Sequence, residues 1–543
     1  MADAVPPKTP STNGKVTRAA WYTLALVSAT QMLSLLDRNI LAILAADIKA
    51  DLNIGDAELG LLYGTVFALF YAIFSLPLGR LADGWVRTRL LAICIVVWSF
   101  STGLAAFAGG FALLALSRLG VGVGEAAAQP AGTSLVYDHF PKSRRGFAMA
   151  AIAAAIALGL GLSLTLGGVA GDWWEARFAD GSAPLGFRGW QFAFAIAALP
   201  GFFLAILLWR LQEPKRGVMD GIESPEDPHP FRASAGILGS VLPVSNWFTF
   251  WRRAASPRDW VVNLGGLALI VAAMAGLTSW ATGFSARPLL QILGLSVNPH
   301  AMQWIVAGIG LYALLNLAQS LRLADKPLFA VLTSPSLLLA IVIGSLQMVI
   351  NYGLMGFTPL FIMQEFGLSP TQTGVQFGIL ATTLGVIGPL ISGPVSDWAN
   401  TRFPGSGRIW VVIVSLGLSP FPAIVAYTST DSVSFYMWFT VHALLLTMWL
   451  PPLYAQMFDL VLPRMRGITF SIYLVSYTIL GLGVGPYSVG MISDANGGEL
   501  GRAILTLFWL APVIVALLIA LLLRVRRDEE GLLDRARGAG EPV

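Results

Sequence analysis

Fourteen stretches of this chain are long and apolar enough to cross a lipid bilayer, and no other feature constrains the fold as strongly. A membrane-spanning helix needs about 20 mostly apolar residues. We therefore expect an all-α polytopic membrane protein. The expected spans are about 20–45, 57–80, 88–109, 111–138, 144–170, 188–212, 258–284, 301–323, 333–363, 370–396, 408–428, 432–458, 466–492 and 502–526.

Composition excludes most other classes of protein. Charged residues make up 12% of the 543 residues, whereas about 25% is usual in soluble proteins. The fraction found here cannot cover a water-soluble fold, so we expect neither a soluble enzyme nor a nucleic-acid binder. The single cysteine, Cys94, excludes an internal disulfide framework, and the four histidines are scattered. We expect no metal, no cofactor and no enzymatic activity.

The lysines and arginines predict the orientation of the chain in the membrane. If the N-terminus is cytoplasmic, 27 of the 34 basic residues fall in cytoplasmic segments, five fall outside, and Arg38 and Arg118 lie within spans. Cytoplasmic loops of membrane proteins carry an excess of lysine and arginine. An even number of spans then places both termini in the cytoplasm, and we expect a bacterial inner membrane protein.

Two segments of six spans each look like copies of one another. Gly79 and Asp83 follow the second span, and Gly393 and Asp397 follow the tenth with the same spacing. Further residues of the first segment have a matching residue in the second, and one constant number of positions separates the members of each pair. This pattern is typical of transporters built by duplication. The further pairs that share this offset are Pro130 with Pro451, Asp138 with Asp459, and Arg145 with Arg466.

The two middle spans interrupt these copies. Residues 283–296 resemble residues 356–369, which favours a duplicated hairpin over chance similarity between glycine- and leucine-rich helices. The copy at 258–323 would then be peripheral. The expected domains are a cytoplasmic tail (1–19), an N-terminal six-helix bundle (20–212), a cytoplasmic linker with an interfacial helix (213–257), the extra hairpin (258–323), a C-terminal six-helix bundle (333–526) and a second tail (527–543).

Several motifs resemble those of the major facilitator superfamily. Gly79, Leu81, Ala82, Asp83 and Arg87 fit the pattern that this family carries after its second span, although Gly84 and Val86 depart from it. The resemblance implies two six-helix bundles and transport by alternating access.

A narrower resemblance is to the Spinster branch. It rests on residues 36–38, on 122–126 and on 188–190. Members of that branch are proton-coupled carriers, and the eukaryotic ones move lysolipids or phosphorylated sphingoid bases. The Asp37–Arg38 pair also occurs in the neighbouring organic-anion symporters, and the extra hairpin is a departure from the branch.

Ionisable residues inside the bilayer are costly and mark function. Asp37 and Arg38 lie in the first span, and Arg118 and Glu125 lie in the fourth. A separation of seven residues places Arg118 and Glu125 on one helix face. We expect one cluster in which Asp37 and Glu125 carry protons, while Arg38 and Arg118 neutralise them or bind a substrate anion. The alternative is a set of static buried ion pairs.

Polar residues at the cytoplasmic ends of the spans predict a gate. Asp83 is expected to accept hydrogen bonds from a facing helix, and Arg87 to pair with a carboxylate of the neighbouring bundle, with Asp138 as the candidate. The alternative is a plain tight turn that obeys the positive-inside rule. The expected gate residues are Gly79, Asp83, Arg87, Asp138, Gly393, Asp397, Asp459 and Arg466.

The second half has Leu446 at the position that matches Glu125, so we expect it to contact substrate rather than protons. For each residue an ordinary packing role is the alternative. The candidate contacts are Asn351, Tyr352, Thr358, His442, Trp449, Tyr473 and Tyr477.

Together these patterns predict a proton-coupled secondary transporter of a small amphiphilic or anionic molecule, such as a lysolipid. Its partners would be this substrate and the lipid bilayer, with protons as the coupling ion, and we expect a monomer. One alternative is an organic-anion/proton symporter that imports a carboxylate nutrient. The other is a membrane sensor that does not transport.

Overall fold

The computed structural model describes residues 16–140, 145–216, 228–242, 244–252, 254–292, 295–324, 326–462 and 465–541. Fourteen helical segments within these ranges are long and apolar enough to cross a membrane. The prediction of an all-α protein with 14 spans is therefore confirmed. The one sheet among the described residues is a short two-stranded ribbon.

The N-terminal half contains the first six spans. Several spans are built from two consecutive helices, because the chain bends without leaving the membrane. A π-helical turn, η1, makes one such joint. The elements are α1 (Arg18–Ile43), α2 (Ala45–Leu52), α3 (Asp56–Gly60), η1 (Leu61–Thr65), α4 (Val66–Gly84), α5 (Arg87–Ala105), α6 (Phe111–Glu125), α7 (Ala128–His139), α8 (Arg145–Arg177), the 3₁₀ turn η3 (Pro184–Gly186) and α9 (Gly189–Arg210).

A linker and two further spans follow. We call α12 and α13, together with the antiparallel strands that join them, the extra hairpin. Leu290 pairs with Val297 in this ribbon. The elements are α10 (Pro230–Val241), α11 (Ser245–Arg252), α12 (Pro257–Phe284), β1 (Leu290–Ile292), β2 (Leu295–Val297), α13 (Pro299–Ala324) and α14 (Lys326–Leu332).

The C-terminal half contains the last six spans. A second π-helical turn, η6, interrupts its fifth span, and Pro486 follows that turn. The elements are α15 (Pro335–Phe366), α16 (Pro370–Arg402), α17 (Gly407–Leu418), α18 (Pro420–Tyr427), α19 (Ser432–Thr447), α20 (Leu450–Asp459), α21 (Arg466–Tyr477), η6 (Thr478–Leu482), α22 (Gly483–Ala495), α23 (Leu500–Thr506), the 3₁₀ turn η7 (Leu507–Trp509), α24 (Leu510–Glu530) and α25 (Leu532–Gly538).

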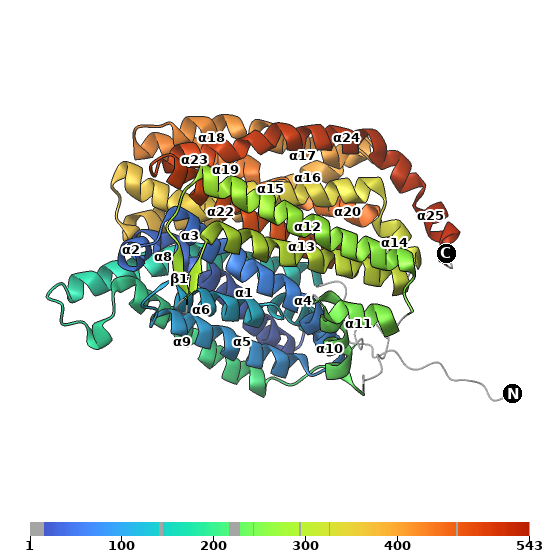
Figure 1. Cartoon of the computed structure of the whole chain (residues 1–543), viewed down its shortest axis with the longest axis horizontal. Coiled ribbons are helices and arrows are strands. Elements are labelled where there is room, and N and C mark those ends of the chain that lie inside the picture. The colour runs from blue at the N-terminus through green and yellow to red at the C-terminus, as the bar shows by residue number, and fades with distance from the viewer. Residues whose placement is uncertain are drawn as a thin grey trace.

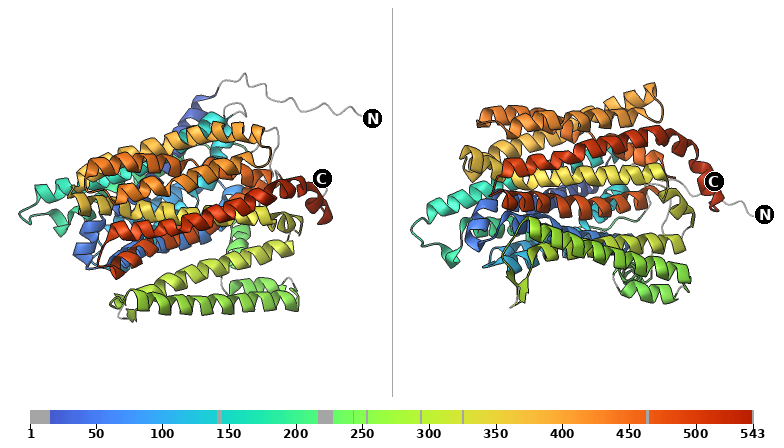
Figure 2. Two further views of the ribbon diagram at one scale, coloured as in Figure 1. Left: turned by 90° about the horizontal axis from the view of Figure 1, so that it is seen from above. Right: turned by 45° about the horizontal axis from the view of Figure 1, so that its top comes forward.

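The two halves lie side by side, with the extra hairpin along one side of both. Figure 1 shows α1–α9 below, α15–α24 above, and α12 and α13 across the front. In Figure 2 the hairpin forms a separate layer against the bundle. Helices α10, α11, α14 and α25 lie at one end of the spans, and α2 and the ribbon lie at the other (Figure 1). We call these ends the inner and outer faces, since the basic residues predict that the first is cytoplasmic.

Residues 79–83 and 393–397, which we expected to follow the second and tenth spans, lie within helices, so neither segment is a tight turn. Helix α4 continues to Gly84, and α16 continues to Arg402. The polar residues that end an apolar run mark where a span leaves the lipid. They do not end the helix, because its backbone hydrogen bonds can continue beyond the lipid.

The linker forms two short helices at the inner face. Helix α10 packs against α4, where Ser234 Oγ donates a hydrogen bond to the Pro77 carbonyl at 2.6 Å. The rings of Trp85 and Phe231 lie 5.0 Å apart. On α11, Phe248 and Trp251 are largely exposed, at 69% and 74%. The aromatic residues that suggested an interfacial helix therefore sit on a short helix with an unburied apolar face.

Candidate functional site

The structure brings the four predicted intramembrane charges together between α1 and α6. Arg38 Nη2 donates to Glu125 Oε2 at 2.7 Å, and Ser34 Oγ donates to the same oxygen at 2.8 Å. The Glu125 side chain is fully buried and that of Arg38 is 11% exposed. Each charge therefore has its partner on the other helix, so the pair spans the α1–α6 contact.

We expected Arg118 to pair with a carboxylate, but it is hydrogen-bonded to backbone carbonyls instead. Its Nη1 and Nη2 atoms donate to the backbone carbonyls of Asp37 and Arg38 at 3.0 and 3.1 Å. These carbonyls lie in the last third of α1, and Arg118 is completely buried. Its guanidinium thus fixes the part of α1 that carries the other charges.

Asp37 is the exceptional member of this cluster. It is completely buried, and neither of its carboxylate oxygens has a hydrogen-bond partner among the described residues. Glu125 Oε1 is also unpartnered within the same part of the chain. A buried carboxylate without a partner is costly when it is ionised. The site therefore contains one paired and one unpaired carboxyl group.

Aromatic rings surround the Arg38 guanidinium. Its Cζ atom lies 4.6 Å from the ring centroid of Phe67 and 4.9 Å from that of Tyr71, both on α4. A guanidinium over an aromatic face is stabilised by a cation–π interaction. Glycine makes this arrangement possible, because a Cβ atom at Gly122 of α6 would lie 2.7 Å from the Phe67 carbonyl oxygen. The sequence analysis missed both rings.

Tyrosines of the C-terminal half face this cluster. Tyr352 of α15 and Tyr477 of α21 both interact electrostatically with Arg38. Tyr473 lies with its ring 5.0 Å from that of Tyr477 and 5.4 Å from that of Tyr454. Three of the predicted substrate contacts therefore gather opposite the charges. Tyr454, which was not predicted, belongs with them.

Two of the other predicted contacts lie elsewhere. Thr358 is buried and hydrogen-bonded to Tyr427 at 2.6 Å within the C-terminal half. His442 Nδ1 lies 2.9 Å from the Ser419 carbonyl, and its ring packs between aromatic side chains of the same half. Both residues have their partners within the C-terminal half, and their assignment as substrate contacts stays a prediction.

The remaining two candidates have local environments. Asn351 Oδ1 accepts a hydrogen bond from Gln347, one turn earlier on α15, at 2.9 Å. Trp449 is buried where α19 passes into α20.

At the inner face, Arg87 organises a buried ion cluster. Its guanidinium donates to Asp138 at 2.5 Å, to Glu213 at 2.6 Å and to Ser134 at 2.7 Å. The predicted partner of Arg87, Asp138, is the one found. The two residues belong to the same half, so their ion pair does not join neighbouring bundles. Glu213, which follows α9, was not predicted. This cluster joins the inner ends of α5 and α7 to the linker.

The C-terminal half repeats this cluster with Arg408. Arg408 forms ion pairs with Asp459 and, at 3.7 Å, with Asp397. The offset of 321 positions that separates Asp138 from Asp459 also separates Arg87 from Arg408. Arg408 was not predicted, although this offset would have found it.

The other gate candidates make few contacts in this structure. Asp83 is exposed, and no hydrogen bond joins it to another described residue. Gly393 lies within α16, with nothing near its Cα that a side chain would meet. Gly79 faces Pro130 of α7. Arg466 begins α21, but its side chain is outside the described part of the chain.

The two halves join at the outer face. Asp494 of α22 accepts hydrogen bonds from the backbone amides of Asp56 and Ala57 on α3, at 3.1 and 2.8 Å. On the other side of the bundle, Asp172 of α8 accepts one from the Thr371 amide of α16 at 3.0 Å. By contrast, the ion clusters at the inner face each stay within one half. The outer ends of the two halves are therefore in direct contact.

Comparison with known proteins agrees with this architecture. The model of the Major Facilitator Superfamily matches residues 27–350 and 337–543. An MFS-type efflux pump of Mycolicibacterium smegmatis is 26% identical over 528 residues, 96% of each chain. Protein spinster of Drosophila melanogaster is 27% identical over 219 residues, 40% of this chain and 34% of that protein.

A solved structure has a similar fold. The inward-facing, occupied structure of a bacterial homologue of the human lysosomal transporter Spinster has a TM-score of 0.63 to this chain. The two sequences are 20% identical, and the match covers 96% of this chain and 98% of that one.

Proposed function

The chain belongs to the major facilitator superfamily of membrane transporters, and from that premise we propose that it is a proton-coupled carrier of a small amphiphilic or anionic organic molecule. The resemblance to the Spinster branch supports an amphiphilic substrate. Alternating access would move this substrate past the charged cluster between the halves.

The observation that carries the proposal is the unpaired, buried Asp37 beside the Glu125–Arg38 pair. Burial favours the neutral, protonated form of a carboxylic acid, whereas an arginine partner favours the ionised form. Arg38 is hydrogen-bonded to Glu125, whereas no arginine is hydrogen-bonded to Asp37. Two buried carboxyl groups on neighbouring helices, only one of them bonded to a guanidinium, form a site in which a proton is held and then released when partners change.

Arg38 links the substrate to the proton. Its guanidinium is partly exposed and flanked by Phe67 and Tyr71, with Tyr352 opposite. A substrate anion that binds Arg38 competes with Glu125 for the guanidinium. Once Glu125 loses this partner, its protonated form is favoured. The aromatic rings suit the apolar part of an amphiphile. Because such coupling is reciprocal, proton and anion bind together, as in symport.

The test uses purified protein in liposomes with an imposed proton gradient. We expect flux of a lysolipid or an organic anion, with proton movement, in the wild type. Asp37→Asn and Glu125→Gln abolish the coupled flux, while Asp180→Asn, at an exposed site outside the spans, leaves it unchanged. Unchanged flux in both cluster variants would refute the carboxylate mechanism.

The sign of the proton change separates the alternatives. Proton uptake on substrate binding supports symport. Proton release supports exchange, which an efflux carrier requires. Substrate binding without any proton change or flux favours the sensor.

A further inference from the structure

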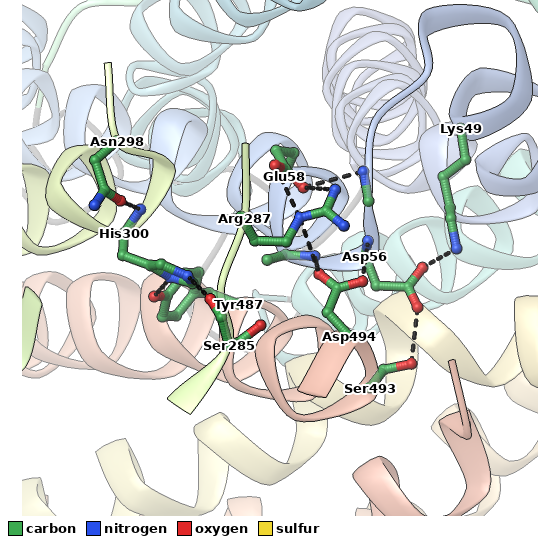
Figure 3. A network of polar contacts seen from close by, with 12 residues as sticks. Lys49, Asp56, Glu58, Ser285, Arg287, Asn298, His300, Tyr487, Ser493 and Asp494 are labelled. Carbon is green, nitrogen blue, oxygen red and sulfur yellow. Dashed lines mark hydrogen bonds and ion pairs between the residues drawn. The ribbon is translucent and has the colours of Figure 1, made fainter. Parts of the chain in front are cut away.

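The extra hairpin contributes a charged side chain to the contact between the two halves. Arg287, in the segment between α12 and β1, donates from Nη2 to Glu58 Oε2 at 2.9 Å and from Nε to Glu58 Oε1 at 3.3 Å. Its Nε atom also lies 3.8 Å from Asp494 Oδ2. Glu58 belongs to α3 and Asp494 to α22, so one guanidinium touches a carboxylate of each half (Figure 3).

These two carboxylates belong to the network that joins the two halves at the outer face. As Figure 3 shows, Asp494 caps the start of α3, Ser493 Oγ donates to Asp56 Oδ2 at 2.8 Å, and Lys49 pairs with the same aspartate. Glu58 is 1% exposed. Without Arg287 it would be a buried charge bonded only to the Gly55 amide, which lies 3.0 Å from Oε2.

The hairpin contacts both halves at a second level, further from the outer face. We call the contact between α3 and η1 of one half and α22 of the other the seam. Gln303 Nε2 of α13 donates to the Gly483 carbonyl of α22 at 3.0 Å, and Thr65 of η1 is hydrogen-bonded to both residues. His300, at the start of α13, lies 2.6 Å from the Tyr487 hydroxyl. The hairpin is therefore fixed to the seam at two levels.

Backbone contacts make this seam very close. A Cβ atom at Gly60 would lie 2.6 Å from the Pro486 carbonyl oxygen, and one at Gly490 would lie 2.1 Å from that of Asp56. Tight packing of this kind has one well-defined closed state, because a small separation loses the contacts altogether.

We propose that the extra hairpin is a component of the outer gate, in which Arg287 locks α3 of one half to α22 of the other. The inference rests on the proposed alternating access. When the halves part at the outer face, Arg287 can remain with only one of its two carboxylates. The lock therefore favours the state that is closed outside, and weakening it favours the state that is open outside.

Arg287 keeps its charge in this site. Burial lowers the pKa of Arg287, but its hydrogen bond to Glu58 and the charges of Glu58 and Asp494 raise it by more, so the net direction is upward. The guanidinium is thus a permanent bridge, and opening must come from movement of the helices.

Gly55 offers a way to displace the guanidinium without changing any charge. A Cβ atom there would lie 1.9 Å from Arg287 Nη2, and the three atoms nearest to it all belong to that guanidinium. The backbone of Gly55 has φ −93°, which alanine adopts without strain. Gly55→Ala therefore moves the far end of one long side chain and leaves the fold intact.

The experiment measures the separation of the outer ends with spin labels in nanodiscs. Cys94, the only cysteine, is buried and is replaced by alanine, and labels are placed at Ala50→Cys and Asn496→Cys, exposed sites on opposite halves. We expect one short distance in this background. Arg287→Gln and Gly55→Ala raise the ratio of the long-distance to the short-distance population about threefold, since a partly exposed ion pair between the halves is lost.

Two further variants complete the test. Arg287→Lys restores much of the closed population, while Arg502→Gln, which removes an exposed arginine at the outer face, leaves the distances unchanged. Distances that stay short in both Arg287→Gln and Gly55→Ala overturn the proposal. If Arg287→Gln does not fold, Gly55→Ala and Arg287→Lys decide it. Because no substrate or proton is needed, this result is independent of whether the transport mechanism holds.

Discussion

Replacing Arg87 by glutamine should destabilise the N-terminal half strongly. The guanidinium is completely buried and donates to two carboxylates, with the side chains of Asp138 and Glu213 only 11% and 23% exposed. Its removal leaves both carboxylates close together without the guanidinium that bridges them. Removing one member of a buried ion pair costs about 3–5 kcal/mol. Because these partners keep some access to water, we expect a loss of about 3 kcal/mol in the free energy of unfolding.

The assay is equilibrium unfolding in mixed micelles, followed by tryptophan fluorescence. Arg89→Gln is the matched control, since Arg89 lies two residues away on the same helix, is exposed and lies over the ring of Trp209. It should change the free energy of unfolding by less than about 0.5 kcal/mol. Adding Glu213→Gln to Arg87→Gln should recover part of the loss, because one uncompensated carboxylate disappears. Equal small effects of Arg87→Gln and Arg89→Gln would refute the reasoning.

Three further predictions follow from the same contacts. Arg408→Gln should cost only about 1 kcal/mol in the same unfolding assay, because its partners are 35% and 72% exposed; a loss as large as that of Arg87→Gln would contradict this. Gly490→Ala should increase labelling of outer-gate cysteines from outside, since its Cβ atom would collide with the Asp56 carbonyl; unchanged labelling would show that the seam yields elsewhere. His442→Gln should keep the transport rate within about twofold, as expected for substitutions away from functional features, and a complete loss would place His442 in the mechanism.

The number and type of spans could be predicted because lipid imposes a minimum apolar length on every helix that crosses it. The duplication could be recognised in the sequence because both halves keep the residues of one structural feature. Residues that form inner-face ion pairs keep their spacing in both halves, and Arg408 was missed only because the offset was not applied to Arg87.

The rotation of each helix about its axis could not be predicted. In a span that is apolar all round, Thr358, His442 and Tyr477 look equally placed to meet a substrate, yet only Tyr477 turns toward Arg38. The orientation of intramembrane charges is easier to predict, because an isolated charge facing lipid is costly. Their clustering was therefore predictable. The exact pairing was not, since Arg118 found backbone carbonyls instead of a carboxylate.

The role of the extra hairpin also depended on contacts that no local pattern contains. Arg287 meets Glu58 and Asp494 from positions 229 and 207 residues away in the chain. Sequence similarity within the chain suggested a peripheral helix pair, whereas the contacts place its outer end in the seam between the halves.

The measurement that tests the central claim most directly is the number of protons taken up when a transported anion binds to purified protein, followed with a pH-sensitive dye. The account predicts uptake of about one proton per bound anion in the wild type, because the anion displaces one carboxylate from its arginine. Glu125→Gln should still bind the anion but take up none. The same proton uptake in Glu125→Gln as in the wild type would contradict the account, because Glu125 would then not be the group that exchanges its arginine for a proton.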